Sequence, residues 1–373
     1  MKRIIRVLFL CLIANVVVGQ SVENQFQKML DSVYKANTEA IGIMIHVESP
    51  DNNISWSSAV GVSNKETNAL LHKKQSVLIA SNTKTYVAAA ILRLVENKQL
   101  QLNQPINKLL NKETADSFCK AGYNLKSITI KNLLSHASGI NDYVNGEYFE
   151  FVKQNPKYEW TRDEQIKKSV LLGEPYAIAG TKFNYGDINY LLLTEIIENS
   201  TKLPFYTAIR KLINYNRIRL NNTWFINLEK QPEISNSLAH QYSNKLDMDS
   251  SNLNPSWDLF GGGGLVSTTK DMALFFQALF EGRIIKDKQL IKEMHTYVLP
   301  KEASNYCLGI RKISFGDYEG YYHGGFWGTD VMYLPEINTS IAVFTLEKDK
   351  RNNINPILSK KVISILKLYS PND

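Results

Sequence analysis

The sequence has few of the residues that build disulfide scaffolds and metal sites. Only 3 of its 373 residues are cysteine, and a disulfide-based fold needs more. The six histidines are scattered, without an HExxH motif or the close paired spacing of a zinc site. We therefore expect neither a metal nor another cofactor. One long-range disulfide between Cys119 and Cys307 remains open at this point.

The chain also lacks a basic stripe, a low-complexity linker and an internal repeat. Its formal charge of +7 falls to +4 when the three basic residues near the start, Lys2, Arg3 and Arg6, are left out. The other positive charges have acidic neighbours, which disfavours binding of nucleic acid. With 44% hydrophobic and 21% charged residues, the composition is that of an ordinary globular protein.

The first 19 residues differ from the rest of the chain. The basic start precedes an apolar run at residues 7–13, and the small residues Val17 and Gly19 follow. This order is typical of a secretory signal peptide, and the apolar run is short for a membrane span. We expect an exported protein, periplasmic or secreted, with no stable membrane span. Residues 20–373 then form the folded domain.

Strand-like segments lie near both ends of the chain, and helical segments lie between them. The strands are expected at residues 41–47, 54–62, 307–313, 319–323, 330–334 and 340–346. Helices are expected at residues 22–35 and 83–100, in short pieces over 105–250, and from about Asn355 to Leu368, with Pro356 in the first turn. The pattern predicts an α+β fold, with an antiparallel sheet flanked by terminal helices and an inserted, mostly helical lobe. The active site is expected in a cleft between them.

The stretch ASNTKTY (residues 80–86) places Ser81 one helical turn before Lys84, at the start of an expected helix. A hydroxyl is a poor nucleophile unless a base removes its proton. Lys84 lies on the same helical face and can be that base if its pKa is depressed. The ordinary alternative is that Ser81 or Thr83 caps the helix, and the pattern alone does not decide.

Two later stretches supply further polar groups. FNYGDINYLLLTEIIE (183–198) carries Tyr185 and Asp187 just before an apolar helix, and YYHGGFWGTD (321–330) ends a strand in His323-Gly324-Gly325. Glycines at such a strand end let the backbone approach a ligand closely.

In order and spacing, Ser-x-x-Lys, Tyr-x-Asp and His-Gly-Gly resemble the motifs of the serine β-lactamase and penicillin-binding family. The resemblance is to the branch that holds class C β-lactamases, DD-carboxypeptidases, D-aminopeptidases and esterases. LLSHASGI (133–140) and GGGGLVSTTKDMALF (261–275) also resemble that branch, and the likeness runs from about residue 25 to 368.

The resemblance implies a role for each matched residue. Ser81 is the acylated nucleophile, and Lys84 with Tyr185 shuttles its proton. The N–H groups of Ser81 and Phe326 form the oxyanion hole, beside Gly324 and Gly325. His323 lines the substrate side and bonds either Tyr185 or a substrate carboxylate.

Ordinary structural roles stand beside these assignments. Tyr185 could be a half-buried packing residue, and His323 a strand-end histidine bonded to backbone. We interpret His136 as structural and the glycine run at 261–264 as a tight turn beside the cleft. If His323 holds a carboxylate, binding should weaken as the ring loses its proton, near the ordinary pKa of ~6.5.

Two departures from the family pattern bear on function. Asp187 stands where the second motif usually ends in Asn, and His-Gly-Gly replaces the Lys-Thr-Gly of β-lactamases. The hypothesis is therefore an exported serine hydrolase that forms an acyl-enzyme on Ser81 and acts on D-amino-acid peptides, amides or esters. The alternatives are a β-lactamase, or a catalytically weak protein that binds penicillin or cell-wall peptides.

Overall fold

A computed structural model describes residues 22–233 and 237–369 of the chain. The expected signal peptide, residues 1–19, lies outside the described residues. No helix in the described part of the chain is both long and apolar enough to cross a membrane.

A six-stranded antiparallel sheet is the centre of the fold, in the order β2-β1-β11-β10-β9-β8. The expected hairpin forms, with β1 (Gly42–Ser49) and β2 (Ile54–Gly61) joined by a 3-10 turn at Pro50–Asn52. Four strands also form near the other end: β8 (Arg311–Phe315), β9 (Tyr318–Gly325), β10 (Thr329–Leu334) and β11 (Thr339–Thr345). β8 begins four residues later than expected, because residues 307–310 are not in a strand. β1 pairs with β11, with Ile43 opposite Thr345, so the sheet joins the two ends of the chain.

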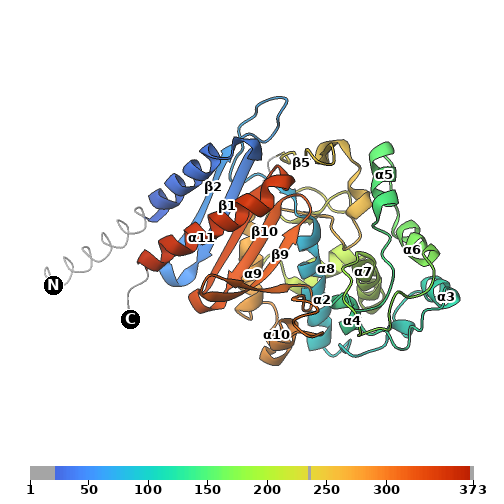
Figure 1. Ribbon diagram of the computed structural model, residues 1–373. Helices are drawn as coiled ribbons and strands as arrows, with labels where there is room; N and C mark the ends of the chain where they lie inside the picture. The colour runs from blue at the N-terminus through green and yellow to red at the C-terminus, as the bar shows by residue number, and fades with distance from the viewer. Residues whose placement is uncertain (1–21, 234–236, 370–373) are drawn as a thin grey trace.

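The two terminal helices cover one face of this sheet (Figure 1). The first occupies residues 22–35 and the last, α11, spans Arg351–Tyr369. Apolar residues recur at helical spacing on one side of each, so that these sides bury a common core with the inward residues of the strands. Phe26, for example, packs on Trp56 of β2 with ring centroids 5.2 Å apart.

The beginning of α11 differs from the expectation. The helix begins at Arg351 and not near Asn355, so Pro356 lies inside it and not in its first turn. Pro356 has no N–H to donate to the carbonyl of Asn352. Two side chains in the first turns of α11 bond to the sheet: Arg351 donates to the end of β9 and Asn355 to the beginning of β10.

The other face of the sheet packs on α9 (Thr269–Phe280), and the helical lobe lies beyond it. Helix α2 (Thr83–Glu96), slightly shorter than expected, runs between sheet and lobe and contacts α7 and α8. The lobe contains α3 (Lys112–Lys120), α4 (Ile130–Leu134), α5 (Gly146–Gln154), α6 (Arg162–Leu171), α7 (Ile188–Thr201) and α8 (Phe205–Ile213). Helix α10 (Lys288–Met294) follows α9. Small sheets, β3-β7-β4 and β5-β6, connect the parts: β3 (Val77–Leu78), β4 (Trp224–Phe225), β5 (Tyr242–Ser243), β6 (Met248–Asp249) and β7 (Leu265–Ser267).

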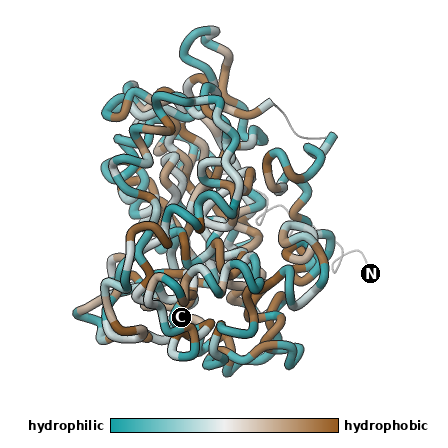
Figure 2. Tube along the Cα trace, turned by 90° about the vertical axis from the view of Figure 1, so that its right-hand side faces the viewer, coloured by the Kyte–Doolittle hydropathy of each residue, from teal (hydrophilic) through white to brown (hydrophobic). Residues whose placement is uncertain are grey.

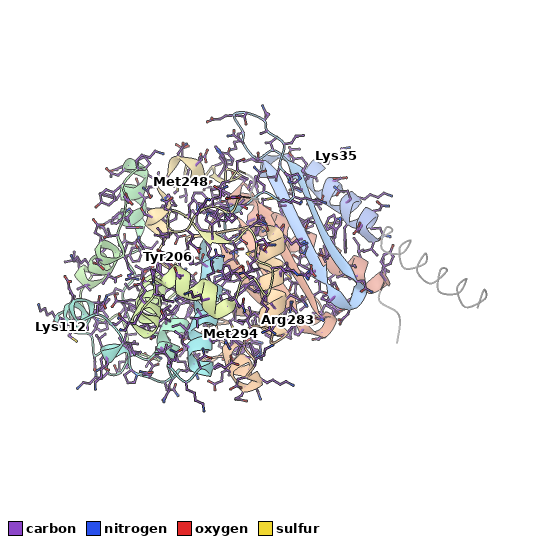
Figure 3. All side chains as sticks on the ribbon, turned by 180° about the vertical axis from the view of Figure 1, so that it is seen from behind. Lys35, Lys112, Tyr206, Met248, Arg283 and Met294 are labelled. Carbon is purple, nitrogen blue, oxygen red and sulfur yellow. The ribbon has the colours of Figure 1, made fainter. Side chains whose placement is uncertain are left out.

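The expected α+β arrangement is therefore confirmed. Viewed from behind, Lys35 beside the sheet and Lys112 on α3 lie at opposite ends of the molecule (Figure 3). Hydrophilic stretches prevail in the peripheral loops, and hydrophobic stretches run through the interior (Figure 2). Cys119 is exposed and Cys307 is buried, and both are free thiols, so the disulfide that the sequence left open does not form.

Candidate active site

Ser81 lies where the sheet, the small sheet and the helical lobe meet. It belongs to a 3-10 helix, Ala80–Asn82, between β3 and α2. The preceding residue, Ala80, has φ of +46°, a left-handed conformation that costs energy for any residue with a side chain. The chain thus turns sharply just before Ser81, and the serine is only partly buried.

The helix-capping explanation of this stretch is wrong. The N-cap residue of α2 is Asn82, and its side chain makes no capping hydrogen bond. Instead the Asn82 amide donates to the carbonyl of Ile79 (3.0 Å) and to the hydroxyl of Thr329 on β10 (2.8 Å). The Thr83 hydroxyl accepts the N–H of Leu265 at 3.2 Å. These bonds tie the Ser81 segment to neighbouring strands.

Lys84 is fully buried and its ammonium group contacts three acceptors. Its Nζ lies 3.0 Å from Ser81 Oγ, 2.6 Å from the carbonyl oxygen of Gly262 and 2.6 Å from Asp187 Oδ1. An ammonium group has three N–H donors and no lone pair. In this arrangement Lys84 donates to Ser81 and cannot accept its proton.

The charge on Lys84 follows from its neighbours. Burial alone would lower its pKa, but the carboxylate of Asp187, followed by Tyr185 and Asp258, raises the pKa above the ordinary value. The sequence hypothesis needed a depressed pKa for Lys84 to act as the base. On this point the hypothesis is wrong, because Asp187 stabilises the charged form.

Tyr185 is the second group beside Ser81. Its ring centroid lies 4.9 Å from Lys84 Nζ, and both Lys84 and Ser81 act on its phenol to lower the pKa. Burial raises the pKa of Tyr185, and the positive charge of Lys84 opposes this shift only in part. The phenol therefore holds its proton at neutral pH, within reach of the serine hydroxyl.

The segment that carries Tyr185 rests on the loop after α4. Asn184 N–H donates to the His136 carbonyl (3.0 Å), and Gly186 N–H donates to His136 Nδ1 (3.2 Å). His136 is completely buried, has φ of +56°, and its ring centroid lies 4.2 Å from that of Tyr185. Burial holds its pKa well below the usual range, so the ring is neutral. These contacts agree with the structural role that we assigned to His136.

Two further carboxyl groups lie near Asp187. Asp142 Oδ1 accepts the N–H of Ile188 at 3.1 Å, and burial and the charge of Asp187 raise the pKa of Asp142 to about 7. Burial and Asp187 also raise the pKa of Asp258 well above its usual range. Lys84 acts on both carboxyl groups as the opposing charge. Three carboxyl groups thus surround one buried ammonium group.

The glycine run explains how these groups approach so closely. A Cβ at Gly262 would lie 2.9 Å from Asp187 Cγ, and one at Gly263 would lie 2.2 Å from Asp258 Oδ2. Gly261 and Gly264 have φ of +98° and +100°, which makes the run a tight turn. The turn was expected, but not the bond from Lys84 to the Gly262 carbonyl.

His323 lies on the opposite side of Lys84, at the end of β9, and is 2% exposed. Its Nδ1–H donates to the Gly324 carbonyl (3.0 Å), and Nε2 accepts from the Tyr306 hydroxyl (3.0 Å). Burial, with the charges of Lys84 and Arg311, holds the pKa of His323 well below its usual range. Its ring bonds Tyr306 where Tyr185 was the expected partner, and the expected loss of its charge near pH 6.5 is wrong.

Gly324, Gly325 and Phe326 bring the end of β9 against the Ser81 segment. A Cβ at Gly325 would lie 2.2 Å from the carbonyl oxygen of Ile79, and one at Gly324 would lie 2.6 Å from Asp330 Oδ1. The Phe326 ring lies beside three other aromatic rings, Phe149, Trp257 and Trp327, with centroid distances of 5.8, 5.7 and 4.9 Å. A small hollow between Ala80, Trp257, Asp258 and Trp327 opens next to this aromatic group.

Several site residues escaped sequence reasoning: Asp142, Asp258, the Gly262 carbonyl and Tyr306. Weak signals existed for two of them. Asp142 follows the stretch LLSHASGI by two residues, and Asp258 precedes the glycine run by three. No group of His, Cys, Asp and Glu side chains among the described residues has the arrangement of a metal site.

Comparison with known proteins adds the family to this geometry. The model of the beta-lactamase family matches residues 32–356. The chain belongs to the beta-lactamase family.

Individual relatives are more distant. Bacillus subtilis PbpX, whose name describes it as a candidate penicillin-binding protein, is 27% identical over 260 residues. These are 69% of this chain but only 58% of that protein. Among solved structures, a D-stereospecific amidohydrolase from Streptomyces sp. superimposes with a TM-score of 0.71 at 23% identity, covering 92% of this chain and 97% of that one. The D-amino acid amidase of Ochrobactrum anthropi SV3 gives a TM-score of 0.74 at 21% identity, covering 94% and 100%. These likenesses show the fold.

Proposed function

We propose that the protein is an exported serine hydrolase that is acylated on Ser81 and acts on D-amino-acid amides, peptides or esters. The observation that carries the proposal is the placement of Ser81 Oγ 3.0 Å from the Lys84 ammonium, which in turn lies 4.9 Å from the centroid of the Tyr185 ring. A nucleophile, a fixed cation and a titratable phenol in one place are what acyl transfer requires.

The charge states assign the proton steps. Lys84 is an ammonium that donates to Ser81, so it cannot be the base. We assign the base to the small ionised fraction of Tyr185, which the adjacent cation favours although burial raises the pKa of the phenol. Ser81 Oγ attacks the substrate carbonyl and gives its proton to Tyr185. The phenol then returns this proton to the leaving amine or alcohol as the acyl-enzyme ester forms. Water then gives a proton to the same phenolate and attacks the ester, and the phenol returns this proton to Ser81 Oγ as the acid product leaves.

The oxyanion of the tetrahedral intermediate requires hydrogen-bond donors from the backbone. We assign these donors to the N–H groups of Ser81 and Phe326. The close approach of Gly325 to Ile79 supports this assignment, because it brings the turn after β9 against the serine segment.

Asp187 and its neighbours bear on the substrate class. An ionised carboxylate accepts hydrogen bonds and cannot donate one to an amide carbonyl, and two more carboxyl groups lie close by. This environment suits a free amine better than an acylamino side chain. It therefore favours amino-acid amides, small peptides and esters over penicillins and cephalosporins. The names of the two structural neighbours, a D-stereospecific amidohydrolase and a D-amino acid amidase, point the same way.

The alternatives are a β-lactamase and a weak penicillin-binding or cell-wall-peptide-binding protein. The name of PbpX favours penicillin binding. The neutral, buried His323 does not, because it offers no charge to a penicillin carboxylate.

The test of the acyl-enzyme is covalent labelling. A fluorophosphonate should add its mass to the peptide that contains Ser81, and Ser81→Ala should lose both label and turnover. The substrate class is then read from a panel of D-amino-acid p-nitroanilides, p-nitrophenyl esters and nitrocefin. Labelling of another serine would overturn the mechanism, and nitrocefin as the best substrate would favour the β-lactamase alternative.

Export rests on residues 1–19 alone and is part of the proposal. The expected product begins at Gln20, which N-terminal sequencing of the protein from the extracellular or periplasmic fraction would detect. An intact N-terminus on a protein that stays in the cytoplasm would contradict export.

A further inference from the structure

The first turn of α7 has an unusual cap. Its N-cap residue is Asp187, a type that normally turns its carboxylate back onto the free N–H groups of its own helix. Here Asp187 makes no side-chain capping bond, and its backbone is helical, with φ of −67° and ψ of −29°. Its carboxylate instead lies 2.6 Å from Lys84 Nζ. The free N–H groups of α7 therefore need another acceptor.

Asp142 is that acceptor. Its Oδ1 accepts the N–H of Ile188, the first residue of α7, at 3.1 Å, and the backbone N–H of Asp187 also bonds to this carboxyl group. The approach is close, since a Cβ at Gly186 would lie 3.1 Å from Asp142 Cβ. Asp142 comes from the loop after α4, far from α7 in the sequence, and caps the helix from outside.

We infer that Asp142 is a positioning residue: it caps α7 in place of Asp187 and so leaves the Asp187 carboxylate free to hold Lys84 beside Ser81. The inference rests on the proposed function in one respect, that Lys84 and Tyr185 serve the acylation of Ser81. Without this cap, Asp187 would compete for the N–H groups at the start of its own helix, and the Lys84 ammonium would lose one of its three acceptors.

The charge of Asp142 gives this role a second signature. Its carboxyl group faces Asp187 and Asp258, with Lys84 as the opposing charge, and the phenols of Tyr143 and Tyr148 lie near the same groups. With a pKa of about 7, raised by burial and Asp187, Asp142 loses its proton near neutral pH. From its charge alone, we expect the ionised form to raise the pKa of Lys84 and of the nearby Tyr185. A neutral replacement should therefore let the base form at lower pH.

The test compares Asp142→Asn, which keeps an acceptor oxygen, with Asp142→Ala, which removes it. We expect Asp142→Ala to lower kcat at least 10-fold and to speed deuterium exchange in residues 184–190. Asp142→Asn should keep kcat within about 3-fold and the exchange near wild type. In the pH profile of Asp142→Asn, kcat/KM should begin to rise at lower pH than in the wild type. The inflection that Asp142 causes near pH 7 in the wild type should be missing.

Asp271→Ala is the matched control. Asp271 is also a buried carboxylate with a raised pKa that accepts a backbone N–H, from Asn222 at 2.7 Å, but on α9. It should lose stability without a change in the pH profile. Equal kcat for the alanine and asparagine variants of Asp142, or an equal kcat loss in the control at matched stability, would overturn the inference. If Ser81 fails to be labelled, the proposed function is contradicted. Deuterium exchange does not depend on Ser81, so it still tests whether Asp142 caps α7.

Discussion

Two ion pairs, each at least partly buried, lie near the candidate nucleophile, and they are built differently. On the sheet side, Arg351 pairs with Asp330. Its Nε lies 2.7 Å from Asp330 Oδ1, and Nη1 donates to the Gly325 carbonyl at 3.1 Å. The Tyr322 hydroxyl donates to Asp330 Oδ1 at 2.5 Å, and the Asn355 amide donates to Asp330 Oδ2 at 2.8 Å. One cation meets one anion, and each oxygen of the carboxylate has a partner.

On the lobe side, Lys84 faces Asp187 with Asp142 and Asp258 close behind. One cation meets three carboxyl groups, so the number of protons in this cluster changes with pH. The comparison separates two tasks. The balanced pair fixes the turn that carries Phe326, and the unbalanced cluster sets where protons lie around Ser81. Damage to the first should appear mainly as lost stability, and damage to the second as lost or redirected activity.

The largest effect is expected from Lys84→Ala and Tyr185→Phe, each lowering kcat/KM about 10²- to 10⁴-fold. Tyr185→Phe removes the proposed base, and Lys84→Ala removes the cation that stabilises the ionised form of this base. The double variant should be little worse than either single one. Tyr190→Phe is the control. The ring centroid of this buried tyrosine lies 5.7 Å from Lys84 Nζ, but its hydroxyl donates to the Leu134 carbonyl. It should cost far less activity. Fully additive losses in the double variant would mean that the two residues act independently.

Arg351→Ala should lower the free energy of unfolding by about 3–5 kcal/mol, because it leaves the Asp330 carboxylate buried without its cation. Urea denaturation measures this loss. The control is Lys367→Ala, which breaks an exposed pair with Asp317 and should cost no more than about 1 kcal/mol. Equal losses in the two variants would remove the distinction between the two sides of the site.

Asp187→Asn should redirect specificity, about 10-fold, towards N-acylated substrates. The amide can donate to an acyl carbonyl, and the loss of its negative charge lowers the pKa of Lys84. The measurement compares kcat/KM on one D-amino-acid amide in its free-amine and N-acylated forms. An unchanged ratio would show that Asp187 holds Lys84 but selects nothing.

The smallest effect concerns His323, whose buried ring should stay neutral as the pH falls through the range where a histidine ordinarily gains its proton. Its ring resonances in NMR, assigned with His323→Asn, should not titrate near the ordinary pKa of about 6.5. Unfolded His323 does bind a proton there, so the folded protein should lose stability as pH falls through that range. A ring that titrates near pH 6.5 would restore the carboxylate-binding role that its burial argues against.

The sequence predicted the elements with strong local periodicity. Both terminal helices, the first hairpin and the strands near the C-terminal end have apolar residues at regular spacing, which fixes their type and inward face. The start of α11 was missed by four residues, because Pro356 suggested a first turn. The fold overrode that signal by using Arg351 and Asn355 to hold the ends of β9 and β10.

The site was predictable only where a motif marks it. Ser81, Lys84, Tyr185 and Asp187 were found by spacing, and the structure brings all four together. The charge on Lys84 follows mainly from Asp187, which is a motif residue. The sequence did not show that Asp142 and Asp258, from distant loops, join the same cluster. Nothing in the local sequence of either aspartate shows that it faces an ammonium group.

The pairing of β1 with β11 has a consequence for how the protein is made. Ile43 of β1 pairs with Thr345 of β11, so the central strands cannot join until almost the whole chain has been synthesised. Such non-local pairing slows folding. The Ser81 segment is held by Thr329 and Gly325 from the same late strands, so a nascent chain has its serine but not the groups around it. We expect hydrolytic activity to appear only after these late strands have joined the sheet.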